Sequence, residues 1–270
     1  SCNDQLTTED AQKVSEETVL SNTTGLNMVL NSAYYWLLLG GSSYYDQVSA
    51  NYSGLPGFAL HYDVGGPDIL CTNNYGGAPE ASYKYLSSRT MSTGDASYIW
   101  GKMYKIINQA NIIIDALNTA TGEDDVKKEI KGQALAMRAI SYFHLLINYQ
   151  QTYAIAKDKR GVILRTSASD EAEKGFSTVQ VCYDQIVADL EEAKLNLQDF
   201  QRDEKWQIDA DVVSGILARV YQVMGNWNGA LTEASTAYQN YSTLMSKEEW
   251  YSGFDDLMAN NCAELMWGVK

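Results

Sequence analysis

The chain has 270 residues, of which 45% are hydrophobic and 20% are charged, and its 34 acidic and 20 basic residues give a formal net charge of −14. This composition is typical of a folded globular protein and excludes a disordered chain. The negative charge would repel a phosphate backbone, and no cluster of lysine and arginine offsets it, so we expect no nucleic acid partner. The longest apolar run, YYWLLLG at 34–40, is far shorter than the roughly 20 residues of a membrane-spanning helix.

The first residues, SCNDQLTTED, place a cysteine at position 2 ahead of a polar stretch. Residues 1–22 are therefore predicted to be a tether, and Cys2 has two interpretations. It is either the lipid-bearing cysteine of a bacterial lipoprotein, whose acyl chains hold the protein on a membrane surface, or an ordinary thiol. The other cysteines, Cys71, Cys182 and Cys262, are widely spaced without a C-x-x-C pair, which allows at most one disulfide and disfavours a cysteine-based metal site.

Residues 23–270 are predicted to be an all-α domain, because amphipathic helical periods dominate them. A first helix is expected from about Thr24 to Leu39. Residues 40–92 are then predicted to be a long loop, because they contain most of the Gly-Gly pairs and all three prolines. Further helices are expected over about 95–117, 130–149 and 177–197, and as a hairpin within 209–241.

The hairpin has a recognisable pattern. Gly225 and Asn226 are expected to turn the chain, and Ala230, Ala234 and Ala237 give its second helix a face of small residues. The Y-x-x-x-G of residues 221–225, followed by alanines four residues apart, resembles the tetratricopeptide pattern, although small-residue helix pairs also occur in other bundles. The helices at 130–149 and 177–197 are predicted to form a looser pair, joined by an insertion at 151–177.

Arg138 lies on a packed face of its predicted helix, in one stripe with Ala134 and Tyr142. A buried cation is costly unless it is paired and hydrogen-bonded. Arg138 is therefore either an anion clamp or half of a structural salt bridge to Asp189 or Asp211. The residues alone favour the salt bridge.

His144 falls on a different side of the same helix, on a polar strip with Gln133, Ser141 and Asn148. We expect this strip to be solvated. A catalytic role for His144 would need a second titrating group beside it, and the other histidine, His61, lies in the predicted loop.

A family resemblance becomes specific at this helix. IKGQALAMRAISYFHLLINY, residues 130–149, resembles the signature helix of the SusD/RagB family of outer-membrane nutrient-binding lipoproteins, with matches at Gly132, Ala134, Arg138, Ala139, Tyr142, Phe143 and Leu145. A family helix that precedes it is similar to the pattern at Trp100, Tyr104, Ile107 and Asn111. STVQVCYDQIVADLEEA resembles the family helix that follows, and ARVYQVMGNWNGAL resembles its tetratricopeptide-like pair.

The resemblance implies tetratricopeptide-like helical pairs at about 95–241, long irregular ligand-binding loops at about 40–92, and a lipidated Cys2. It implies structural roles for Trp100, Asn111, Arg138 and Tyr142. Family members are longer, so residues 242–270 are expected to begin a further region and the chain to be an amino-terminal portion.

Tyrosines are concentrated in and around the predicted loop, with eleven of the 19 between residues 34 and 104. Tyr34, Tyr35, Tyr98 and Tyr104 sit in helical patterns and are expected in the core. The others lie among Gly, Ser and Asn, and rigid rings with polar tips among such residues suit a sugar chain. The candidate glycan-binding residues, which offer hydrogen bonds or stacking faces, are Asp68, Asn73, Asn74, Tyr75, Tyr83 and Tyr85. The alternative is that Asp68 starts a turn and the tyrosines pack the loop onto helices.

The function implied by the resemblance is capture of an oligosaccharide or polysaccharide at the bacterial outer-membrane surface and its delivery to a TonB-dependent SusC-like transporter. No catalytic fingerprint is found and the paired acidic residues are typical of solvated surface, so we expect no enzyme activity, no cofactor and no metal. The alternatives are peptide capture, as in RagB-like members, and a helical-repeat adaptor that binds only protein.

Overall fold

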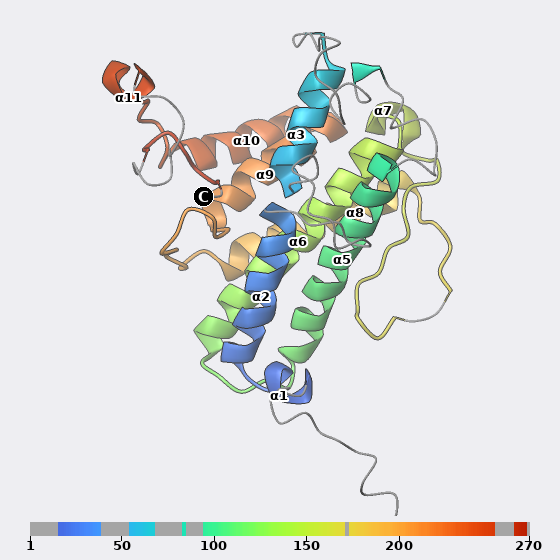
Figure 1. Ribbon diagram of the computed structural model, residues 1–270, viewed down its shortest axis with the longest axis vertical. Helices are drawn as coiled ribbons and strands as arrows, with labels where there is room; N and C mark the ends of the chain where they lie inside the picture. Colours follow the sequence, from blue (N-terminus) through green and yellow to red (C-terminus); the bar gives the residue numbers. More distant parts are fainter. Residues whose placement is uncertain are drawn as a thin grey trace, which may run out of the picture.

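A computed structural model describes residues 16–38, 54–67, 83–84, 94–170, 173–251 and 262–268 (Figure 1). All named elements in these residues are helices, which confirms the all-α prediction. They are α1 (Glu16–Leu20), α2 (Thr23–Leu38), α3 (Gly54–Gly65), α5 (Gly94–Ala116), α6 (Asp124–Tyr149), α7 (Tyr153–Ala156), α8 (Val179–Asn196), α9 (Ala210–Met224), α10 (Trp227–Tyr238) and α11 (Lys247–Tyr251). Within the described ranges, no helix is both long enough and apolar enough to cross a bilayer.

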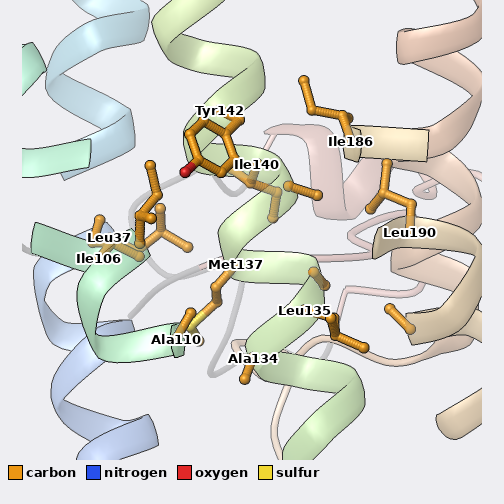
Figure 2. Packing of buried hydrophobic residues seen from close by; sticks show 14 of the residues in the cluster. Leu37, Ile106, Ala110, Ala134, Leu135, Met137, Ile140, Tyr142, Ile186 and Leu190 are labelled. Carbon is orange, nitrogen blue, oxygen red and sulfur yellow. The ribbon is translucent and has the colours of Figure 1, made fainter. Parts of the chain in front are cut away.

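The helix α6 is the centre of the molecule, packed by α2 and α5 on one side and by α8 on the other. Figure 2 shows Met137 and Tyr142 facing Leu37 and Ile106, and the α8 residues Ile186 and Leu190 on the opposite side of α6. Nearly every residue of α6 between Ile130 and Leu146 is buried. A helix that is apolar on most sides is expected to be surrounded in this way.

Gly132 permits the close approach of α8 to α6. A Cβ atom at this position would lie 2.5 Å from the Leu197 side chain and 3.1 Å from the Ala193 carbonyl oxygen. Any larger residue would force the helices apart. This contact explains why the pattern of the helix contains a glycine, which is otherwise unfavourable inside a helix.

The predicted helical hairpin is present as α9 and α10. Gly225 ends α9 with φ of +77°, a left-handed conformation that glycine adopts without penalty. The Asn226 side chain then accepts a hydrogen bond from the Gly229 N–H at 3.1 Å and caps α10. The looser pair is also confirmed, because α6 and α8 pack against each other and the insertion between them contains α7.

Two helices lie where the sequence analysis placed irregular chain. The helix α3 occupies part of the predicted loop 40–92, and α1 occupies part of the predicted tether 1–22. Pro56 lies in the first turn of α3, where a missing N–H costs nothing. Phe58 and Val64 anchor the helix with exposed fractions of 1% and 4%, so tertiary packing outweighs the weak helix propensity of its glycines.

Candidate functional site

A buried polar centre surrounds Arg138 on α6. Its Nε and Nη2 donate to the two carboxylate oxygens of Asp189 on α8 at 2.8 and 2.7 Å. Its Nη1 donates to the Asn111 side-chain oxygen on α5 at 2.9 Å and to the Thr166 carbonyl oxygen at 3.1 Å. Both side chains of the ion pair are almost completely buried.

The salt-bridge interpretation of Arg138 is therefore confirmed, with Asp189 as the partner. Asp211 instead accepts a hydrogen bond from Asn240. Burial would lower the pKa of Arg138, but the Asp189 carboxylate outweighs it and the pKa is raised. Four of the five guanidinium N–H groups of Arg138 have protein partners, so the group is committed to structure and not to an external anion.

The same centre fixes the main chain of the insertion, over residues 163–168. The Tyr104 hydroxyl donates to the Ile163 carbonyl and accepts from the Ile163 N–H, at 2.8 and 3.0 Å. The Tyr142 hydroxyl does the same for Arg165, at 2.8 and 2.6 Å. Each hydroxyl thus bonds both main-chain groups of one residue, as a neighbouring β-strand would. We call the side chains of Tyr104, Tyr142, Asn111 and Asp115 the insertion clamp.

Asn111 and Asp115 complete the insertion clamp from α5. The Asn111 amide nitrogen donates to the Arg165 carbonyl at 3.0 Å. One Asp115 carboxylate oxygen accepts from the Ser167 hydroxyl and the Ala168 N–H, at 2.7 and 2.8 Å. The predicted structural roles of Asn111 and Tyr142 are thereby explained by these contacts. Trp100 has a packing role, with its ring 5.0 Å from that of Tyr104 and 5.1 Å from that of Tyr149.

We predict that Tyr142→Phe lowers the free energy of unfolding by about 1–3 kcal/mol, because it leaves the part-buried Arg165 N–H without its acceptor. Hydrogen exchange at the Arg165 amide measures the effect directly and should accelerate. Tyr183→Phe is the matched control, since Tyr183 is a buried tyrosine for which packing against Phe143 and Tyr153 is the main contact. Equal losses in the two variants would contradict the prediction.

The prediction that the polar strip on α6 is solvated is wrong. Gln133 and Ser141 are buried, with exposed fractions of 4% and 0%. Gln133 accepts a hydrogen bond from the Tyr34 hydroxyl at 2.7 Å, and Ser141 donates to the Met137 carbonyl at 2.8 Å. His144 is shielded by α3, whose Phe58 ring lies 6.1 Å away.

Among the described residues, His144 has no catalytic partner. Its Nδ1 is buried and forms no hydrogen bond with any of them. Burial lowers the pKa of His144 to about 4, so the imidazole is neutral at physiological pH. Within the described residues, no group of three or more His, Cys, Asp or Glu is placed to hold a metal ion, and Cys182 and Cys262 are free and buried.

The predicted glycan-binding residues are only partly located. Asp68, Asn73, Asn74, Tyr75 and Tyr85 lie outside the described residues, as does Cys2. Tyr83 is described and is half-buried. Of the tyrosines expected in the core, Tyr34 and Tyr98 are buried, but Tyr35 is 49% exposed on α2 and that expectation is wrong.

An exposed tyrosine that the sequence analysis did not select lies on α3, directly before the predicted binding segment. The Tyr62 ring is 42% exposed, and its hydroxyl accepts a hydrogen bond at 2.7 Å from Asn148 of α6. Asp63 and Pro67 beside it are also exposed. The four-residue spacing of Phe58 and Tyr62 puts both rings on the same side of α3, so the exposure of Tyr62 depends on tertiary packing that the sequence pattern does not show.

The comparisons with known proteins decide the family. The profile of the SusD-like family described as "Starch-binding associating with outer membrane" matches residues 77–222, more than half of the chain. The chain belongs to the SusD-like family. The matched range contains Arg138, its partner Asp189 and the whole insertion clamp. SusD-like binding proteins are non-catalytic.

Similar proteins agree with the SusD-like assignment. A SusD-like carbohydrate-binding protein of Bacteroides vulgatus is 25% identical with a TM-score of 0.78, over 92% of this chain and 50% of that one. A laminarin-binding SusD-like protein, at 18% identity, shares the fold with a TM-score of 0.64 over 84% of this chain and 45% of its own. SusD-like protein P38 of Formosa agariphila is 26% identical over 68% of this chain and 32% of that protein.

The SusD-like chain therefore spans about half the length of these solved structures and about a third of that curated relative. The matched part contains the helical scaffold on which the insertion is fixed.

Proposed function

We propose that this protein captures an oligosaccharide or polysaccharide at the bacterial outer-membrane surface and delivers it to a TonB-dependent SusC-like transporter. The observation that carries the proposal is membership of a family described as starch-binding and associated with the outer membrane. Lipid on Cys2 is the proposed anchor. The action is binding and release, so no bond in the ligand is broken.

The proposed glycan surface is centred on Tyr62 of α3 and continues into the segment with Asp68, Asn73, Asn74 and Tyr75. The Tyr62 ring is accessible, and the hydrogen bond from Asn148 restrains it. A restrained ring loses little conformational entropy when a ligand stacks on it. Its apolar face suits the C–H face of a sugar, while the Asn148 amide and the Asp63 carboxylate offer polar groups nearby.

We predict that Tyr62→Ala weakens binding of a cognate oligosaccharide at least roughly tenfold, because it removes the stacking face. Isothermal titration calorimetry of the parent against a panel of plant, host and microbial oligosaccharides identifies the ligand and then measures the loss. Tyr35→Ala is the matched control, since Tyr35 is similarly exposed but lies on α2. Its affinity should equal that of the parent.

A second variant, Asp68→Ala with Tyr75→Ala, tests the proposed extension of the surface and should also lose affinity. No heat with any sugar from folded protein, or heat with peptides alone, would overturn the glycan proposal.

A further inference from the structure

A turn rich in cations lies at the start of the insertion, directly after α7. Residues 157–160, KDKR, which we call the basic turn, contain three cations and one carboxylate, and all four residues are exposed. None of the three cations forms an ion pair with a described carboxylate, whereas the exposed Lys128 and Lys174 are both paired. The basic turn therefore presents unpaired positive charge on an acidic chain.

Main-chain contacts hold the basic turn against the start of α8. The Gln180 N–H donates to the Lys157 carbonyl at 2.8 Å. Arg160 and Thr178 form an isolated antiparallel bridge. The cations are thus carried on a fixed backbone, which reduces the conformational entropy that is lost when a ligand binds.

The Arg160 guanidinium is arranged as a receptor for an anion. Its Cζ atom lies 3.5 Å from the centre of the Phe176 ring, so the planar group stacks on an aromatic face. No described group accepts a hydrogen bond from this guanidinium, whereas four N–H groups of Arg138 are used inside the core. A stacked arginine whose N–H groups are unused can bind both oxygens of a carboxylate.

The basic turn lies at the same end of α6 as Tyr62. The Lys159 ammonium donates to the side-chain oxygen of Gln151, two residues after α6 ends, at 2.6 Å. Tyr62 accepts its hydrogen bond from Asn148, in the last turn of α6. Figure 1 shows α7 at the end of the molecule away from α1. A sugar chain bound at Tyr62 can therefore extend to the basic turn.

Charge screening makes the basic turn compatible with the net charge of −14. At physiological ionic strength the field of an exposed charge fades over about 8 Å. A long phosphate backbone would still meet the acidic remainder of the surface. A short ligand at the basic turn is influenced mainly by the three cations and by the Asp158 carboxylate between them, and the balance is attractive.

We propose that the basic turn is a carboxylate-binding subsite and that the glycan captured by this protein contains uronic acid. The Arg160 guanidinium binds the carboxylate through two hydrogen bonds, and Lys157 and Lys159 add positive charge. Asp63 beside Tyr62 favours a neutral sugar there, so the acidic sugar is the one at the basic turn. This inference rests on the proposed glycan function and names the class of its ligand.

The test compares acidic oligosaccharides with their methyl esters, in which the charge is removed and the sugar chain is kept. Short oligosaccharides of galacturonate, alginate and hyaluronan are titrated by calorimetry at low salt. We expect at least one free acid to bind at least roughly tenfold more tightly than its ester, because the ester cannot form charge-assisted hydrogen bonds. Added salt should narrow this difference.

The double variant Lys159→Gln/Arg160→Gln should lose the preference for the free acid and keep the affinity of the parent for the ester. Lys127→Gln/Lys128→Gln is the matched control, since it removes the same charge near the other end of α6 and should keep the preference. Circular dichroism verifies that both variants are folded.

Several outcomes would overturn the inference. Equal affinity for every acid and its ester, with binding retained, would overturn it and leave the proposed function standing, as would loss of the preference in the control variant. Equally tight binding of polyglutamate would make the ligand an acidic peptide. Tight binding of a carrageenan oligosaccharide alone, which has sulfate and no carboxylate, would assign the basic turn to sulfate. No heat with any sugar, charged or neutral, would overturn the proposed function together with the inference.

Discussion

Asp189→Ala is expected to lower the free energy of unfolding by roughly 3–5 kcal/mol. The variant leaves the Arg138 guanidinium in the core without the carboxylate that accepts two of its hydrogen bonds. The side chains of Arg138 and Asp189 are 6% and 3% exposed, so water cannot replace the lost partner. Urea unfolding at neutral pH, followed by far-ultraviolet circular dichroism, measures the loss.

Asp184→Ala is the matched control for this prediction. Asp184 lies on the same helix and accepts a hydrogen bond from Gln180, but it is exposed, so its loss should cost about 0.5 kcal/mol or less. The double variant Arg138→Met/Asp189→Leu removes both charges and should recover much of the stability lost in Asp189→Ala. Similar losses in Asp189→Ala and Asp184→Ala would show that the ion pair is not essential.

Lys102→Met is expected to stabilise the protein by roughly 3 kcal/mol at neutral pH. Lys102 on α5 has an exposed fraction of 0%, and its ammonium group donates to the Tyr98 hydroxyl at 2.7 Å. No carboxylate pairs with it among the described residues. Burial, and the charge of Lys105 to a smaller extent, lower the pKa of Lys102 from 10.5 to about 8. At about 1.4 kcal/mol per pH unit, this change gives the expected gain.

The pH dependence distinguishes this cause from better packing. At pH 7 Lys102 is protonated in both the folded and the unfolded chain, and the folded chain bears the whole cost of burial. Between about pH 8 and 10.5 the folded chain releases the proton first, so the parent gains stability relative to Lys102→Met as the pH rises. Urea titrations at pH 7 and pH 10 measure this difference. A stability gap that stays constant with pH, or an equal gain in the surface variant Lys128→Met, would contradict the electrostatic explanation.

The sequence predicted well the elements whose signals are local. The helix predicted over 177–197 is present as α8, which Thr178 caps by accepting a hydrogen bond from the Val181 N–H at 3.3 Å, and Gly225 ends α9 in the expected turn. The partner of Arg138 could be narrowed to two aspartates. The choice between Asp189 and Asp211 depends on how α6, α8 and α9 pack, which periodicity does not determine.

The sequence analysis missed the helix α3, and the wrong prediction that His144 is solvated follows from this. The glycines and prolines of residues 54–67 indicate a loop, and burial of Phe58 and Val64 stabilises α3. Because α3 was not predicted, neither was the cover that it places over His144. Tyr62 was also overlooked for this reason, since its exposure depends on the helix that carries it. The other candidate glycan-binding residues remain predictions.

The insertion clamp also has a consequence for proteolysis. A protease must draw an extended, unpaired stretch of main chain into its cleft, and the insertion offers Lys157, Lys159, Arg160 and Arg165 as cleavage sites. The main chain at Ile163 and Arg165 is hydrogen-bonded to the hydroxyls of Tyr104 on α5 and Tyr142 on α6, which lie 59 and 23 residues away in the sequence. Cleavage there therefore requires separation of those helices, and this stretch of the insertion survives digestion as long as the core does.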